Sequence, residues 1–180
     1  MIIRSMQPQE LSLIVRIYVD TFKATHHGVV SDMFLSTLSY ENALPRFAAI
    51  VEKKEHTPFC YVVQDGDAVI GYALAARTGD SPPLYQAYQG ELKTMYILPA
   101  YHRMGLGRTL VHAVTRRFQQ ERVQSFFVGT FRDNYPARRF YEVLGGCLIE
   151  ECQGEIRGEV CQLAAYGWES VSDLLQLLSS

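Results

Sequence analysis

The sequence lacks strong net charge and long apolar runs. Its 17 lysines and arginines nearly balance 19 aspartates and glutamates, giving a formal net charge of −2 and a pI of about 6.2. Such a balance creates no overall field that attracts nucleic acid or an anionic membrane. No apolar run approaches membrane-spanning length, and the start Met-Ile-Ile-Arg-Ser lacks the basic flank and apolar core of a signal peptide. We therefore expect a cytoplasmic protein that binds neither nucleic acid nor a membrane.

The sequence also lacks paired cysteines and a clear set of metal ligands. No Cys-x-x-Cys pair occurs among the four cysteines, so we interpret them as small buried hydrophobic residues. They are Cys60, Cys147, Cys152 and Cys161. The adjacent His26 and His27 suggest a metal site, but no carboxylate or cysteine stands at a matching spacing. We therefore expect no bound metal.

No internal repeat, low-complexity tract or linker divides the chain. An apolar content of 48% with 20% charged residues is ordinary for a globular protein. A chain of 180 residues is long enough for one domain with a substantial core and too short for two comfortable ones. The sequence therefore predicts a single domain over residues 1–180.

Apolar periodicity and turn residues predict alternating strands and helices. The predicted strands cover residues 2–6, 59–64, 68–77, 92–98, 125–130, 147–153 and 158–168. The first predicted helix begins at Pro8 and ends near residues 26–28. The other predicted helices cover 31–38, 41–54, 105–121, 134–144 and 171–178. Asp65-Gly66-Asp67 is typical of a hairpin turn, and we expect the last two strands to join around Gly154.

The stretch from Glu91 to Val111 combines a strand with a glycine-bearing helix start. Pro99 ends the strand, and the helix opens at Gly105-Leu106-Gly107. The first N–H groups of a helix have no internal partner, and the helix dipole adds positive charge there, so this is a place where phosphate binds. Glycine lets the backbone approach such a ligand.

Two familiar phosphate motifs do not fit this stretch. No Lys-Ser or Lys-Thr follows the second glycine, which excludes a P-loop. The third glycine of a dinucleotide fingerprint is missing, and no βαβ unit opens the chain.

Two segments resemble the cofactor motifs of the GCN5-related N-acetyltransferases, the GNAT superfamily. Residues 102–107, His-Arg-Met-Gly-Leu-Gly, resemble its pyrophosphate loop, Gln/Arg-x-x-Gly-x-Gly/Ala. Residues 134–145 resemble its second cofactor segment, Asn-x-x-Ala-x-x-Phe-Tyr-x-x-x-Gly. The chain departs from the family at His102, where Gln or Arg is usual, and at Gly146, where an aromatic residue often follows the glycine.

The resemblance implies a fold and an activity. The fold is α/β in layers, with a mixed, mostly antiparallel twisted sheet of six to seven strands, flanked by helices and splayed between the fourth and fifth strands. The activity is transfer of an acetyl group from acetyl-CoA to a primary amine of a small molecule or peptide.

The same resemblance assigns the cofactor contacts. They are Ile97, His102, Arg103, Met104, Gly105, Leu106, Gly107, Arg108, Asn134, Ala137 and Tyr141. The backbone N–H of Ile97 is expected to donate to the thioester oxygen, as in an oxyanion hole. Asn134 is expected to contact the cofactor or its loop, and it is also well suited to cap the following helix.

Two residues are the predicted acid and base. The resemblance places Tyr141 beside the cofactor sulfur, where its phenol can protonate the departing thiolate; the alternative is a packing aromatic. Glu91 stands eleven residues before His102, where some family members carry a glutamate that deprotonates the amine. The alternatives are an exposed charge at a strand start and a chain of waters in place of a base.

The acceptor side is less defined. In the family the helix-loop-helix region that starts with the first helix forms one wall of the acceptor site, which makes His26, His27 and Glu41 candidate substrate contacts. The loop over residues 78–90 either closes over the acceptor or only connects two strands. The final helix docks on the sheet or on a second subunit, which leaves a homodimer open.

Two other functions stay open. A non-catalytic acyl-CoA-binding sensor would keep the glycine loop without the chemistry. An acetyltransferase acting on aminoacyl-tRNA would need a local basic patch, which Arg132, Arg138 and Arg139 could supply.

Overall fold

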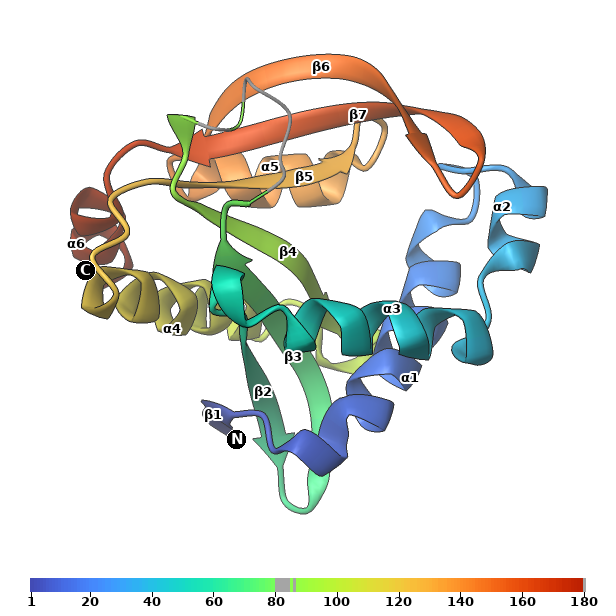
Figure 1. The fold of residues 1–180 in the computed structure, drawn as a ribbon, viewed down its shortest axis with the longest axis horizontal. Helices are drawn as coiled ribbons and strands as arrows, with labels where there is room; N and C mark the ends of the chain where they lie inside the picture. The colour runs from blue at the N-terminus through green and yellow to red at the C-terminus, as the bar shows by residue number, and fades with distance from the viewer. Residues whose placement is uncertain (80–84, 86, 180) are drawn as a thin grey trace.

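The computed structural model describes residues 1–79, 85 and 87–179, and seven strands in this part form one sheet (Figure 1). They are β1 (Ile2–Ser5), β2 (Phe59–Asp65), β3 (Ala68–Arg77), β4 (Gly90–Ile97), β5 (Phe126–Phe131), β6 (Cys147–Ile156) and β7 (Glu159–Trp168). Their order across the sheet is β1-β2-β3-β4-β5-β7-β6. Every neighbouring pair is antiparallel except β4 with β5, which is parallel. The predicted mixed, mostly antiparallel sheet is confirmed.

Six α-helices accompany the sheet in the described residues. They are α1 (Leu11–His26), α2 (Asp32–Thr37), α3 (Tyr40–Glu52), α4 (Leu106–Gln120), α5 (Tyr135–Val143) and α6 (Val171–Ser179). Short 3₁₀ turns cover Pro8–Glu10, Lys54–His56 and Pro99–Tyr101. The side chains of Ser31, Ser39, Asn134 and Ser170 each accept a backbone N–H at a helix start. These polar caps explain where α2, α3, α5 and α6 begin.

The helices cover both faces of the sheet. Consecutive strand residues point to opposite faces. Val63 of β2 and Ala73 of β3 join a core with α4, α5 and α6, whereas Val62 and Leu74 join a second core with α1, α2 and α3. Figure 1 shows α4 and α6 on the opposite side of the strands from α1 and α3. The site therefore forms in a sheet that is supported on both sides.

The β6–β7 hairpin differs from the prediction. Gly154 does not form the turn; it lies inside β6 and pairs with Cys161. The turn lies at Arg157 and Gly158, whose φ angles of 56° and 82° are left-handed. A Cβ at Gly154 would lie 2.6 Å from the terminal methyl group of Leu163, so this side chain packs over the glycine.

The cysteine prediction is confirmed only in part. Cys60 and Cys161 are buried, and burial raises the pKa of Cys60 to about 12. Cys147 is exposed, so its assignment as a buried residue is wrong. It is the first residue of β6, an edge strand with one free side.

The predicted splay between the fourth and fifth strands is confirmed. β4 and β5 pair only at Gly90 with Phe126 and at Glu91 with Phe127. Beyond this point β4 carries a bulge, because Leu74 of β3 pairs with Thr94 and Ala75 pairs with Leu92. Lys93 is the extra residue, and such a bulge bends the strand. The backbone edge of β4 toward β5 is thereby left without a strand partner.

Among the described residues, none of the helices combines the length and apolar character needed to cross a membrane.

Trp168 ties the last strand to α5, and its replacement tests that link. Its indole Nε1 donates to the Leu144 carbonyl at 2.8 Å in a buried setting, and its ring stacks on Phe126. We expect Trp168→Phe to lower the free energy of unfolding by about 1–3 kcal/mol, because the buried carbonyl loses its partner. Urea denaturation measures the change. Tyr135→Phe, at a residue 67% exposed, is the control and should change nothing; equal effects of the two variants would contradict the link.

Candidate active site

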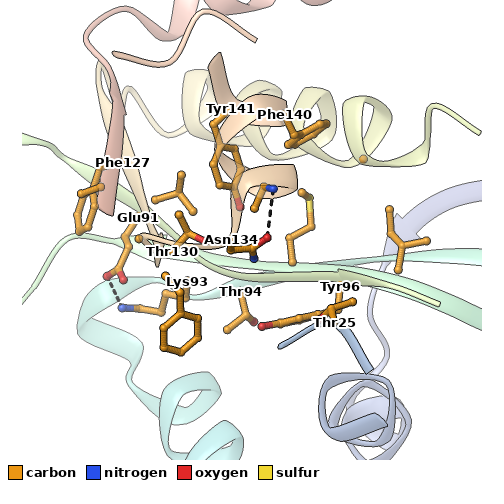
Figure 2. Close-up of a pocket in the computed structure, with 18 of the residues that line it drawn as sticks. Thr25, Glu91, Lys93, Thr94, Tyr96, Phe127, Thr130, Asn134, Phe140 and Tyr141 are labelled. Atoms are coloured by element: carbon orange, nitrogen blue, oxygen red, sulfur yellow. Dashed lines mark hydrogen bonds and ion pairs between the residues drawn. The ribbon is translucent and has the colours of Figure 1, made fainter. Parts of the chain in front are cut away.

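The opening between β4 and β5 leads into a cavity of about 1170 Å³. Its walls come from α1, β4, β5, the loop before α4 and the start of α5. Figure 2 shows side chains from these elements directed into one space, among them Glu91, Thr130 and Tyr141. Most of the predicted site residues meet here, although they are spread over the sequence.

The glycine loop forms one end of the cavity. Arg103 and Gly105 have φ angles of 65° and 79°, so the chain takes two left-handed positions just before α4. Gly105 is the residue before the helix and has no side chain, so no side-chain cap binds the first N–H groups of α4. Alternating backbone conformations of this kind point successive N–H groups into one concavity, which binds anions. The helix dipole adds to this effect.

Gly107 explains how the two sequence motifs meet in space. A Cβ at Gly107 would lie 3.1 Å from the Phe140 ring of α5, closer than side chains normally pack. The absence of a side chain therefore lets α5 lie against the start of α4. The pyrophosphate-loop motif and the Asn-to-Gly motif form one surface.

Two polar side chains at this loop have partners within the protein. The imidazole Nε2 of His102 lies 2.7 Å from the Ile97 carbonyl, so it donates there and ties the loop to the end of β4. The Arg108 guanidinium donates to the Leu177 carbonyl near the end of α6, at 2.6 Å. Arg103 and Met104 are exposed beside the loop. The unusual histidine at position 102 thus holds the loop by a side-chain hydrogen bond.

Asn134 caps α5, as predicted. Its Oδ1 accepts the Ala137 N–H at 3.3 Å, the bond drawn in Figure 2. Its Nδ2 lies 3.3 Å from the Nε2 of His26 on α1. Both ends of the carboxamide are therefore engaged, and both residues line the cavity.

Tyr141 directs its hydroxyl into the cavity (Figure 2). The residue is only 7% exposed, and its hydroxyl hydrogen-bonds none of the residues that the structure describes. Burial raises the pKa of Tyr141 to about 12. The phenol consequently stays protonated at neutral pH and is available as a proton donor.

Glu91 lies at the point where the strands part, and Lys93 is its partner. Their side chains, two residues apart on β4, form an ion pair of 2.5 Å and are 22% and 26% exposed. Both line the cavity, and Figure 2 shows them side by side. The alternation of strand residues would have placed Lys93 on the face of Glu91, so the sequence held a signal for it.

The three predicted substrate contacts separate in the structure. His26 lies in the cavity wall and is 3% exposed. Burial lowers the pKa of His26, against a smaller opposing effect of its hydrogen bond to the Phe22 carbonyl. His27 and Glu41 are exposed and do not line the cavity.

Sequence reasoning missed several lining residues. Tyr85 stacks on Phe127 with ring centroids 4.6 Å apart and hydrogen-bonds Glu150 of β6. Thr94 and Thr130 also line the cavity (Figure 2). No local sequence pattern predicts that these residues line the cavity, because only the arrangement of the strands brings them together. Residues 80–84 and 86 of the predicted closing loop lie outside the described residues.

Within residues 1–79, 85 and 87–179, no group of three or more histidine, cysteine, aspartate or glutamate side chains is arranged to hold a metal ion.

Comparison with known proteins agrees with this geometry. Residues 16–145 match the model of the Acetyltransferase (GNAT) family. The chain is 26% identical over 178 residues to YuaI of Bacillus subtilis (strain 168), described as an uncharacterized N-acetyltransferase, with 98% of each protein covered.

Solved structures share the fold at low identity. The yncA protein of Salmonella typhimurium, solved with its cofactor acetyl-CoA, is 19% identical, with a TM-score of 0.68 and 94% and 93% of the two chains covered. The PaiA N-acetyltransferase of Thermoplasma acidophilum, solved with coenzyme A, is 16% identical, with a TM-score of 0.70 and 93% and 98% covered.

A splayed sheet with a glycine-lined helix start at its opening defines an acyl-CoA-dependent N-acyltransferase. The match over most of the chain makes the assignment specific: the protein belongs to the Acetyltransferase (GNAT) family.

The contact between Gly107 and Phe140 predicts a coupling between the two motifs. In a Phe140→Leu background, Gly107→Ala should stabilise the fold, because alanine favours a helix over glycine by up to about 1 kcal/mol. In the wild-type background the new Cβ meets the Phe140 ring. We expect the gain to be lost there, giving a coupling energy of about 0.5–1 kcal/mol in a double-mutant cycle. Equal effects in both backgrounds would show that the two motifs do not touch.

Proposed function

We propose that the protein transfers an acetyl group from acetyl-CoA to a primary amine on a small molecule or peptide. The observation that carries the proposal is the packing of the two motif segments against each other along one cavity, at the place where β4 loses its strand partner. The YuaI relative and the acetyl-CoA complex of yncA support the same reading.

The residues present suit acetyl-CoA. The first N–H groups of α4 would hold the pyrophosphate, and Gly105 leaves room for it, since nothing lies within 4 Å of a Cβ added there. Arg103 is exposed beside this point and would add a charge-assisted contact. The unpaired edge of β4 would accept the pantetheine arm as an added strand, with the Ile97 N–H as donor to the thioester oxygen.

Two side chains would manage the protons. The amine nitrogen attacks the thioester carbonyl, the C–S bond breaks, and the amide product forms as one proton leaves nitrogen and one joins sulfur. Glu91, directly or through water, would take the proton of the amine. Tyr141, with a pKa of about 12, would stay protonated and donate its proton to the departing sulfur. A free thiol has a pKa of about 8.5, so this transfer must accompany the breaking of the C–S bond.

Lys93 adds a condition to the base role. The Lys93 ammonium bonds Oε2 of Glu91 at 2.5 Å, and its positive charge repels a second cation near this carboxylate. An incoming ammonium group would therefore compete with Lys93 for Glu91 before it gives up its proton.

The alternative with aminoacyl-tRNA loses support. Arg132, Arg138 and Arg139 pair with Asp133, Glu151 and Glu142 at 3.1, 2.6 and 3.9 Å. Carboxylates beside each arginine weaken the basic patch that RNA would need. A cytoplasmic location, a single domain and a homodimer built on α6 stay predictions from the sequence.

The first experiment is a thiol-release assay with acetyl-CoA against a panel of amines, beside calorimetric binding of acetyl-CoA. We expect binding of acetyl-CoA and turnover with at least one class of amine. Binding without turnover on any amine would favour the non-catalytic sensor. No binding would overturn the proposal.

Tyr141→Phe tests the acid. The variant keeps the ring but loses the only proton that this residue can give. We expect kcat to fall by about 10- to 100-fold while the Kd for acetyl-CoA stays the same. Tyr135→Phe, at an exposed residue that does not line the cavity, should leave both unchanged. A Tyr141→Phe enzyme with normal turnover would remove the residue from the mechanism.

Glu91→Gln tests the base. The neutral amide keeps the shape of the side chain but accepts no proton at accessible pH, so we expect kcat/KM for the amine to fall by at least about tenfold with a changed pH–rate profile. Glu41→Gln is the matched control, because Glu41 is exposed and lies outside the cavity. An unshifted profile for Glu91→Gln would leave proton removal to water.

A further inference from the structure

His26 uses both ring nitrogens inside the protein. Nδ1 lies 3.0 Å from the Phe22 carbonyl oxygen, and Nε2 lies 3.3 Å from the Asn134 amide nitrogen. A carbonyl oxygen only accepts, so Nδ1 carries the hydrogen. An amide nitrogen only donates, so Nε2 must be the bare, accepting nitrogen. One neutral tautomer satisfies both bonds.

The orientation of the Asn134 carboxamide is fixed by its second hydrogen bond. Asn134 Oδ1 accepts the Ala137 N–H, which caps α5. Rotating the carboxamide by half a turn would place Oδ1 against the lone pair of His26 Nε2 and an NH₂ group against the Ala137 N–H. Both bonds would then be lost, so the two contacts select a single orientation of the amide.

The surroundings of His26 favour this neutral form. The ring stacks on Phe22 with centroids 4.1 Å apart and meets the edge of Phe131 at 5.1 Å. Burial penalises the charged imidazolium. Thr25 Oγ1 also lies 3.0 Å from Nδ1, and it donates its own hydrogen to the Thr21 carbonyl, so it can share the Nδ1 hydrogen as an acceptor.

We infer that His26 is a positioning residue: its Nε2 holds the Asn134 carboxamide and so links α1, on the acceptor side, to the start of α5, on the cofactor side. Among the described residues, this is the only side-chain hydrogen bond from α1 to Asn134 or α5. α5 carries Phe140 against Gly107 and Tyr141 in the cavity, so a shift of its first turn moves both. The kinetic test of this inference rests on the proposed function.

Three variants separate positioning from substrate contact. His26→Phe keeps the ring stack but offers no acceptor. His26→Gln keeps a hydrogen-bonding group near the position of Nε2. Asn134→Ser keeps a helix cap, because serine is a favoured capping residue, but its side chain is too short to reach His26.

The expected pattern concerns acetyl-CoA rather than the amine. His26→Phe should raise the Kd for acetyl-CoA and lower kcat by about three- to tenfold together, the effect of one lost hydrogen bond, with the KM for the amine unchanged. Asn134→Ser should do the same, the double variant should be no worse than either single variant, and His26→Gln should recover most of the loss. A rise confined to the KM for the amine would make His26 a substrate contact, and multiplying effects in the double variant would show that the two residues act independently.

An NMR measurement tests the bond without any activity. The imidazole ¹⁵N shifts of the wild-type protein should show His26 neutral with the hydrogen on Nδ1, and Asn134→Ser should change the Nε2 shift. A hydrogen on Nε2 would overturn the inference, even if His26→Phe fails to fold. Failure of the wild-type protein to bind acetyl-CoA would instead overturn the proposed function and leave the NMR result standing.

Discussion

The loss of pairing between β4 and β5 after Glu91 is the constraint on which the rest of the site depends. Two parallel residue pairs hold the strands together, and the bulge at Lys93 then bends β4 away. A sheet that continued to pair would have no cavity and no free backbone edge. Because helices pack on both faces, the strands can part at one end without the sheet coming apart. The opening is therefore built into the arrangement of the strands.

The helix α5 turns this opening into a site with defined chemistry. It is held at its start by Asn134, against α4 through Phe140 and Gly107, and after its end by the bond from Trp168 to Leu144. These contacts fix Tyr141 in a buried position with its hydroxyl free toward the cavity. Burial raises the pKa of its phenol to about 12, so the residue carries its proton over the whole neutral range.

Local sequence rules predicted the elements well where the chemistry is local. The glycines before α4, the asparagine before α5 and the hairpin residues 65–67 act on their own neighbours, and each stands where it was expected. The same rules misplaced the β6–β7 turn, because Gly154 pairs with Cys161 inside β6 and the turn lies at Arg157 and Gly158. They also misjudged Cys147, since burial depends on whether a strand lies at the edge of the sheet.

The sequence by itself determined the two cofactor motifs, the strand and helix that carry the first of them, and the family that both resemble. A helix start and its glycines follow from neighbouring residues in the sequence, so they can be recognised without a structure. Strand alternation already places Lys93 beside Glu91. Only the tertiary structure decided that His26 faces Asn134 and that His27 and Glu41 stand apart from the cavity. These outcomes depend on how α1 lies over the splayed strands, a packing between segments about one hundred residues apart that no local pattern encodes.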